Sequence, residues 1–209
     1  MVPADGYLPA LQEWCTANGI VFIADEIQSG MGRTGKYWAS EHLGLVPDMI
    51  LSAKGIAGGL PLAGVTGRAE IMDSAQPGGL GGTFGGNPVS AAAAIAVFEQ
   101  IESNDLLAEG VRIGNTLTTA LLELQERYPV IGDVRGIGAM IAIELVQPGT
   151  RDPNPAAVAA LASHAAQNGV LVLTAGTYGN VLRFLPSLAI SDELLLEAVG
   201  VLDEGFAGL

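Results

Sequence analysis

Cysteine and positive charge are the scarcest features of this 209-residue sequence. Its single cysteine, Cys15, has no partner within the chain, so the sequence excludes a small secreted scaffold held together by disulfides. Lysine and arginine total 9 against 22 aspartates and glutamates, and the net charge of −13 would repel a nucleic-acid backbone. We therefore expect no nucleic-acid partner. Because the N-terminus also lacks a basic, apolar leader, we expect a cytoplasmic location.

Long hydrophobic runs are also missing. The longest alanine-rich run, residues 91–97, falls well short of the roughly 18 apolar residues of a membrane span, so no membrane partner is expected. Metal-binding patterns are absent too, because neither His42 nor His164 has a cysteine or carboxylate at ligand spacing. With 49% hydrophobic and 15% charged residues, the composition is that of a globular chain with a sizeable core.

Strand-length apolar runs and helical patterns alternate in the first half of the chain. A helical pattern ends at Gly19, and residues 20–24 then read as a buried strand. Further apolar runs over 49–53 and 62–66 complete the expected α/β unit, in which we predict a largely parallel, two-sided sheet. Asn87 followed by Pro88 predicts the start of a long helix.

The second half predicts a smaller α+β domain, and we place the domain boundary near Asn104. Residues 1–104 would then belong to a large domain and residues 105–209 to a small one. The expected elements of the small domain are helices over 106–128, 156–167 and from Ser191 onward, a strand over 138–145, and a strand pair before the last helix.

Two of the predicted strands end in residues with useful chemistry. Asp25 and Lys54 would lie at the same edge of a parallel sheet, which is where open α/β sheets bind ligands. An amine in such a crevice can attack an aldehyde to form a Schiff base, and a carboxylate can keep a pyridine nitrogen protonated. Taken singly, each residue has an ordinary alternative, as a turn aspartate or as a solvated surface lysine.

A glycine pattern offers a different interpretation. Residues 30–35 match the G-x-G-x-x-G pattern of dinucleotide-binding folds. That motif requires an amphipathic helix directly after the glycines, whereas residues 36–39 show no helical stripe, and Asp25 and Glu26 would place acids beside a pyrophosphate. A nicotinamide-binding dehydrogenase is therefore the weaker hypothesis.

A set of segments carries a further signal, namely residues 23–30, 32–35, 52–55, 58–64, 78–88 and 176–183. Together these segments resemble the class III signature of the pyridoxal-phosphate-dependent aminotransferases. The resemblance covers almost the whole chain, and it implies the fold type I, aspartate aminotransferase-like, α/β architecture: part of the large, mostly parallel sheet domain followed by a C-terminal α+β small domain.

The resemblance implies roles for five residues. Lys54 would bind pyridoxal 5′-phosphate as a Schiff base and then act as the general base of the proton shift. Asp25 would pair with the pyridinium, Gln28 would hydrogen-bond near the phenolic oxygen, and Thr83 would donate to the phosphate across a dimer interface. Arg183 would grip a substrate carboxylate, and its alternative is an ion pair with a local acid. Two neighbours in the signature, Glu26 and Arg33, are expected to orient its turn by hydrogen bonds.

The implied reaction is a ping-pong transfer of the terminal amino group of an omega-amino acid, 4-aminobutyrate, to 2-oxoglutarate, giving succinate semialdehyde and glutamate. Residues 176–183 and 132–144 favour 4-aminobutyrate over acetylornithine, ornithine or diaminobutyrate, which other members of the family use. Enzymes of this class are about twice as long. We therefore expect a C-terminal fragment that is inactive alone, from an enzyme that forms a homodimer or larger assembly; a non-catalytic fragment is the remaining hypothesis.

Overall fold

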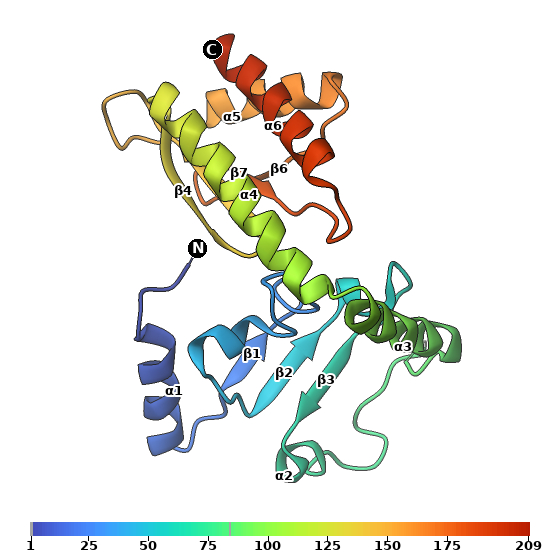
Figure 1. The fold of residues 1–209 in the computed structure, drawn as a ribbon. Helices are drawn as coiled ribbons and strands as arrows, with labels where there is room; N and C mark the ends of the chain where they lie inside the picture. The colour runs from blue at the N-terminus through green and yellow to red at the C-terminus, as the bar shows by residue number, and fades with distance from the viewer. Residues whose placement is uncertain (1, 84) are drawn as a thin grey trace. The chain divides into compact units, whose positions relative to one another are not determined.

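The chain divides into two compact units (Figure 1). The computed structural model describes residues 2–83 and 85–209. The first unit spans residues 3–107 and the second spans residues 108–209. Asp25, Gln28, Lys54 and Thr83 belong to the first unit, whereas Arg183 belongs to the second.

The first unit is built on a three-stranded sheet with the order β1-β2-β3. Strand β1 (Ile23–Asp25) runs parallel to β2 (Met49–Ser52), and β3 (Gly64–Gly67) runs antiparallel to β2. The connection over residues 53–63 contains only the short 3-10 helix η2 (Lys54–Ala57). A parallel return needs a crossover of a dozen or more residues, usually with an α-helix, so this shorter connection brings β3 back antiparallel.

The helices of the first unit begin and end at residues that the sequence marks. Helix α1 (Tyr7–Ala17) is followed by Asn18 as its C-cap, and the next residue, Gly19, has the left-handed φ of 66° that favours glycine. Helix α3 (Pro88–Ser103) starts where Asn87 Oδ1 accepts the N–H of Val89 at 2.9 Å, which confirms the predicted cap. The remaining helical elements are short, namely η1 (Ala39–Leu43) and α2 (Ala69–Met72).

The prediction of a buried strand over residues 20–24 is wrong. Strand β1 starts only at Ile23, and in the part of the chain that the structure describes it pairs with β2 alone. Its apolar side chains are left accessible, with Ile20, Val21 and Ile23 between 44% and 50% exposed. One edge of the sheet therefore presents backbone groups and apolar side chains that a buried strand would cover.

The second unit holds a four-stranded antiparallel sheet with the order β4-β5-β7-β6. Among the described residues, no helix combines the length and apolar character that crossing a membrane requires. The strands are β4 (Ile131–Ile137), β5 (Met140–Leu145), β6 (Leu173–Ala175) and β7 (Val181–Phe184), and the helices are α4 (Leu106–Arg127), α5 (Pro155–Gln167) and α6 (Asp192–Ala207).

One apolar cluster joins the three helices of the second unit to a single face of its sheet. In β5 every second residue is fully buried, as the two-residue period of a strand requires. Helix α4 buries residues at intervals of three and four, which places them on one stripe. The residues that define this contact are Ile141, Ile143 and Leu145 of β5 and Ile113, Leu117, Leu121 and Leu124 of α4.

Candidate active site

Asp25 and Lys54 lie at the same edge of the first sheet. Asp25 is the last residue of β1 and stands in register with Leu51 of β2, while Lys54 opens η2 just beyond the end of β2. The N–H of Glu26 donates to Leu51 O at 3.0 Å and extends this ladder one residue past Asp25. Because β1 and β2 are parallel, both chemical groups emerge from the carboxyl ends of their strands, where α/β sheets place ligands.

The backbone of Lys54 is strained. Its φ is 52°, in the left-handed region that residues other than glycine rarely occupy, at a cost of roughly 1–3 kcal/mol. The Lys54 residue is exposed, so burial of the side chain does not explain this conformation. Strain of this kind gathers at functional sites, where the surroundings fix a side chain in a direction that an ordinary backbone would not give it.

Asp25 and Gln28 present accessible polar groups beside that edge. Asp25 Oδ1 accepts the N–H of Ile27 at 3.1 Å, a bond that orients the carboxylate and uses only one of its roughly four acceptor positions. Gln28 lies in the turn that follows β1, and it is exposed like Asp25. A carboxylate and an amide are thus held within one short segment at the end of β1.

The turn after β1 is tied together by the buried carboxylate of Glu26. Its Oε2 accepts the hydroxyl of Ser29 at 2.5 Å and the N–H of Ala39 at 3.0 Å, and its Oε1 accepts the N–H of Ser40 at 2.7 Å. These bonds confirm that Glu26 orients the turn. Arg33, in the same turn, is partly buried, and this burial lowers the pKa of its guanidinium; its orienting role stays a prediction.

The geometry after the glycine pattern speaks against dinucleotide binding. Residues 36–38 form a bend, and in the described chain the next helical element is η1, a 3-10 helix of 5 residues. The dinucleotide motif needs a full α-helix there, because the dipole and free N–H groups of its first turn hold the pyrophosphate. Gly30 instead packs beneath Trp38, since a Cβ at Gly30 would lie 2.7 Å from the Trp38 ring.

Thr83 and Arg183 lie apart from this edge in the sequence. Thr83 is exposed in the connection between α2 and α3. Arg183 lies on β7 of the second unit, in register with Ala142 of β5 and Leu173 of β6, and it is half-buried. The residues paired with it on the neighbouring strands are both apolar.

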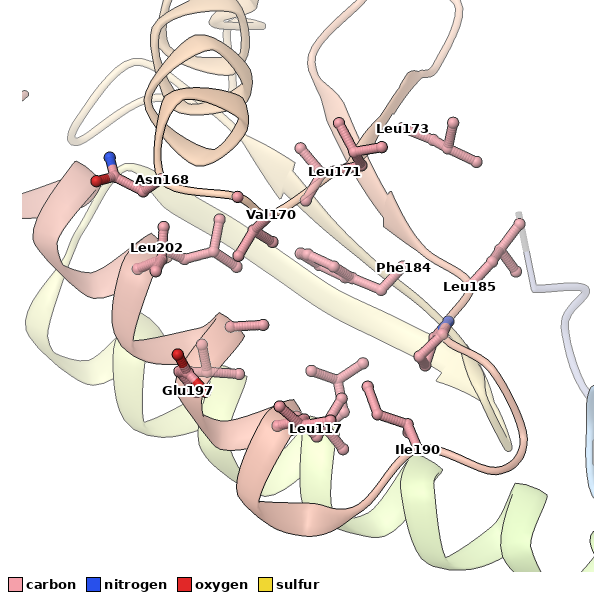
Figure 2. Close-up of a pocket in the computed structure, with 18 of the residues that line it drawn as sticks. Leu117, Asn168, Val170, Leu171, Leu173, Phe184, Leu185, Ile190, Glu197 and Leu202 are labelled. Carbon is pink, nitrogen blue, oxygen red and sulfur yellow. The ribbon is translucent and has the colours of Figure 1, made fainter.

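Arg183 lines a cavity of about 400 Å³ in the second unit. Figure 2 shows Phe184, Val170 and Leu202 around this space, which lies between α6, the sheet and the segment leading into β6. The lining is mainly aliphatic and holds no lysine. It therefore lacks the amine and hydroxyl donors that an aldehyde-bearing phosphate ester would need.

The residues of the first unit fit pyridoxal 5′-phosphate by their chemistry. Lys54 offers a primary amine for the aldehyde and Asp25 a carboxylate for the pyridinium, both at one sheet edge. Gln28 offers an amide that can donate to a phenolic oxygen, and Thr83 offers a hydroxyl for the phosphate. The strained backbone of Lys54 adds an independent sign that this edge is a site.

This chain matches a family model and several known proteins. The family model described as aminotransferase class-III matches residues 1–205. The 4-aminobutyrate aminotransferase of Mycobacterium leprae is 54% identical over 202 residues, covering 97% of this chain and 45% of the relative. The 5-aminovalerate aminotransferase DavT of Pseudomonas putida is 49% identical over 209 residues, covering 97% of this chain and 49% of the relative.

A solved structure gives the same result for the fold. An amine transaminase from an uncultivated Pseudomonas species, in its pyridoxal-phosphate-bound form, superposes with a TM-score of 0.89 at 36% identity. The match covers 99% of this chain and 49% of that one. The chain thus spans about half the length of the curated relatives and of the solved structure that it matches.

Proposed function

Since the chain belongs to the class-III aminotransferase family, whose members use pyridoxal 5′-phosphate, we propose that it supplies the lysine-bearing part of an omega-amino-acid aminotransferase. The observation that carries this proposal is the strained Lys54 at the sheet edge it shares with Asp25. The proposed reaction moves the terminal amino group of 4-aminobutyrate to 2-oxoglutarate, in two half-reactions that give succinate semialdehyde and glutamate.

Lys54 is the catalytic residue of this proposal. When bound, pyridoxal phosphate supplies an electron sink for the negative charge that develops on the substrate carbon. Lys54 Nζ would hold the cofactor through its aldehyde carbon, whose oxygen leaves as water. Once the substrate amine has taken its place, the same Nζ would act as the general base that moves the proton of the substrate carbon. The exposed position of Lys54 leaves its amine free to exchange partners.

Three residues of the first unit are proposed to hold the cofactor. Asp25 keeps the pyridine nitrogen protonated, because a carboxylate stabilises the positive charge on that ring. Gln28 donates its amide N–H to the phenolic oxygen and tunes the ring without reacting. Thr83 donates its hydroxyl to the phosphate. All three are exposed in this chain, as groups that contact a ligand must be before it binds.

Arg183 is proposed to bind the substrate carboxylate. The printed names of the relatives point to 4-aminobutyrate and 5-aminovalerate, both with a carboxylate at one end and a primary amine at the other. A guanidinium fork suits a carboxylate because it donates two parallel N–H bonds. The two substrates differ by one methylene, a difference worth about 1–3 kcal/mol where an apolar pocket surrounds it. The apolar groups around the substrate chain would therefore decide the preferred length, because Arg183 would bind the carboxylate of either substrate.

A cytoplasmic location is part of the proposal. The single cysteine, Cys15, is a buried free thiol and is used in no disulfide. Chains of the oxidising compartments use disulfides much more often than chains of the reducing cytoplasm. The strong net negative charge of −13 favours a dissolved protein over a nucleic-acid-bound one.

We also propose that two copies associate through α3 and the connection that bears Thr83. Near that connection Leu80, Val89 and Ile95 are 73%, 65% and 63% exposed, and the last two lie on α3. Contiguous exposed apolar patches mark protein interfaces, and we propose that these side chains belong to one. The interface would bring Thr83 of one copy to the cofactor of the other, so the phosphate would be held from both sides of the dimer.

Replacing Ile95 with glutamate is expected to convert the associated chain to monomers, because a carboxylate in an apolar interface loses its hydration without gaining a partner. Sedimentation equilibrium across a range of protein concentrations measures the change. Glu99→Gln, one turn further along the same helix and also exposed, is the control and should leave the association as it is. If the wild type and Ile95→Glu associate to the same molecular mass, Ile95 is not part of the interface.

The reaction is tested by following the visible absorbance of the bound cofactor as amino donors are added. We expect 4-aminobutyrate and 5-aminovalerate to remove that absorbance and 2-oxoglutarate to restore it. Because the chain spans about half the length of its curated relatives, the assay is run with the chain alone and with the remaining part of the Mycobacterium leprae relative added. We expect turnover only in the second mixture.

Butylamine is the matched control, because it has the terminal amine of 4-aminobutyrate without the carboxylate. It should react at least about 100-fold more slowly, as expected when a bidentate charged contact is lost. Equal rates for butylamine and 4-aminobutyrate would rule out carboxylate recognition by Arg183. No change of absorbance with any donor, even after complementation, would overturn the proposed reaction.

A further inference from the structure

Glu26 has a charged side chain that is buried, at 4% exposure, and the proposed reaction gives it no role. A carboxylate is withdrawn from water only where donors replace its hydration. Here the donors are Ser29 from the turn itself and the N–H groups of Ala39 and Ser40, which lie 13 and 14 residues further along the chain. Both oxygens are used, so the carboxylate closes the whole loop over residues 26–40.

The backbone of Glu26 is hydrogen-bonded both to the strand that leads to Lys54 and to the turn that contains Gln28. Its N–H donates to Leu51 O at 3.0 Å, three residues before Lys54, and its C=O accepts the N–H of Gly30 at 3.0 Å. Asp25 precedes it directly and Gln28 lies between it and Gly30. A movement of Glu26 would therefore move both proposed cofactor contacts of the segment.

The same loop also packs against the turn that carries Lys54. Met31 is 8% exposed and has a left-handed φ of 57°, and a Cβ placed on Gly55 would lie 3.6 Å from Met31 Cβ. Met31 N–H donates to Tyr37 O at 2.7 Å, which holds it within the closed loop. Met31, within the loop that Glu26 closes, thus lies beside Gly55, the residue that follows Lys54.

We propose that Glu26 is a positioning residue of this site: its buried carboxylate closes the loop over residues 26–40 and thereby sets Asp25, Gln28 and the Lys54 turn for the cofactor. The inference rests on the proposed function for the identity of that cofactor. Its structural part, the dependence of the Lys54 turn on the Glu26 carboxylate, does not need a ligand to be tested.

Glu26→Gln is the informative variant, because it keeps the shape and changes the donors. The amide has one oxygen and one NH₂ group. If the NH₂ replaces Oε1 it meets the N–H of Ser40, and if it replaces Oε2 it meets the N–H of Ala39. Donor faces donor in either orientation, so the loop cannot close as before. Glu41→Gln is the matched control, since Glu41 is exposed and its Oε1 accepts a single bond at the same short helix, from Trp38 N–H at 2.8 Å.

Hydrogen–deuterium exchange of the whole chain, without cofactor, is the first measurement. Glu26→Gln should speed exchange roughly 10-fold or more in peptides covering residues 27–40 and also in those covering residues 53–58, as expected for a lost network of charged hydrogen bonds. Glu41→Gln should speed exchange only around Trp38. Unchanged exchange over residues 53–58 in Glu26→Gln, or the same change in both variants, would overturn the inference.

Labelling with pyridoxal phosphate is the second measurement and separates positioning from mere stability. In Glu26→Gln we expect slower borohydride-trapped labelling of Lys54 and a displacement of about 0.5 in the pH midpoint of the visible absorbance, whereas Glu41→Gln keeps the wild-type values. If Glu26→Gln unfolds the unit, Ser29→Ala removes one of the three donors and should give the same changes at smaller size. A wild type that is never labelled at Lys54 would remove the proposed function, and the exchange experiment would still decide the role of Glu26.

Discussion

Lys54→Ala is expected to abolish covalent attachment of pyridoxal phosphate to this chain. A Schiff base needs an uncharged primary amine, and alanine provides none. The sequence contains only two lysines, Lys36 and Lys54, so few amines compete for the aldehyde. Incubation with pyridoxal phosphate, reduction with borohydride and peptide mapping should place the adduct of the wild type on Lys54 and show none at that position in the variant.

Lys36→Ala is the natural control for this experiment. Lys36 is exposed and lies in the loop after β1, so it meets the reagent freely but is not at the sheet edge. The Lys36→Ala variant should keep the adduct on Lys54. An adduct found mainly on Lys36 in the wild type would show that Lys54 has no special reactivity. Binding of a nicotinamide dinucleotide without any adduct would favour the dehydrogenase hypothesis instead.

Much of the fold could be predicted from local signals in the sequence. Asn87 and Ser191 mark helix starts because their side chains accept backbone N–H bonds within three residues, and the structure has both caps. Such interactions depend only on neighbours in the chain. Strand β2 could be predicted from the sequence equally well, because its apolar run is bounded by turn residues on both sides.

Two strands show where local signals fail. Strand β4 was not predicted, because Gly132, Asp133 and Gly136 interrupt its apolar pattern, and it forms because β5 pairs along it in antiparallel register. Strand β1 was predicted as buried, yet its apolar side chains are exposed. An apolar run indicates that its side chains are suited to burial, but it does not indicate which other segment packs over them.

Parts of the candidate site could likewise be predicted from the sequence, and other parts could not. Asp25 and Lys54 could be placed together from the sequence, because the ends of parallel strands meet at one edge. The extent of the Glu26 network could not, since two of its donors are backbone N–H groups of Ala39 and Ser40, which leave no mark in the sequence. The strained φ of Lys54 is likewise a property that only the folded backbone reveals.

In the second unit, Gly114→Ala is expected to cause a large loss of stability. Gly114 lies inside α4, and a Cβ there would stand 2.4 Å from the carbonyl oxygen of Gly138, in the turn between β4 and β5. Backbone atoms cannot rotate away as a side chain can, so the helix or the hairpin must shift. We expect a loss at or above the upper end of about 1–3 kcal/mol in the free energy of unfolding, measured by urea denaturation.

Gly200→Ala separates packing from helix propensity. Gly200 lies inside α6, it is exposed, and a Cβ there would meet no atom within 4 Å. Alanine favours the helical backbone over glycine by about 0.5–1 kcal/mol, so this variant should be more stable than the wild type. The same substitution is thus expected to act in opposite directions in two helices of one unit. If both variants gain stability, α4 does not approach the hairpin as closely as Gly114 indicates; if both lose it, the effect belongs to the substitution and not to the contact with Gly138.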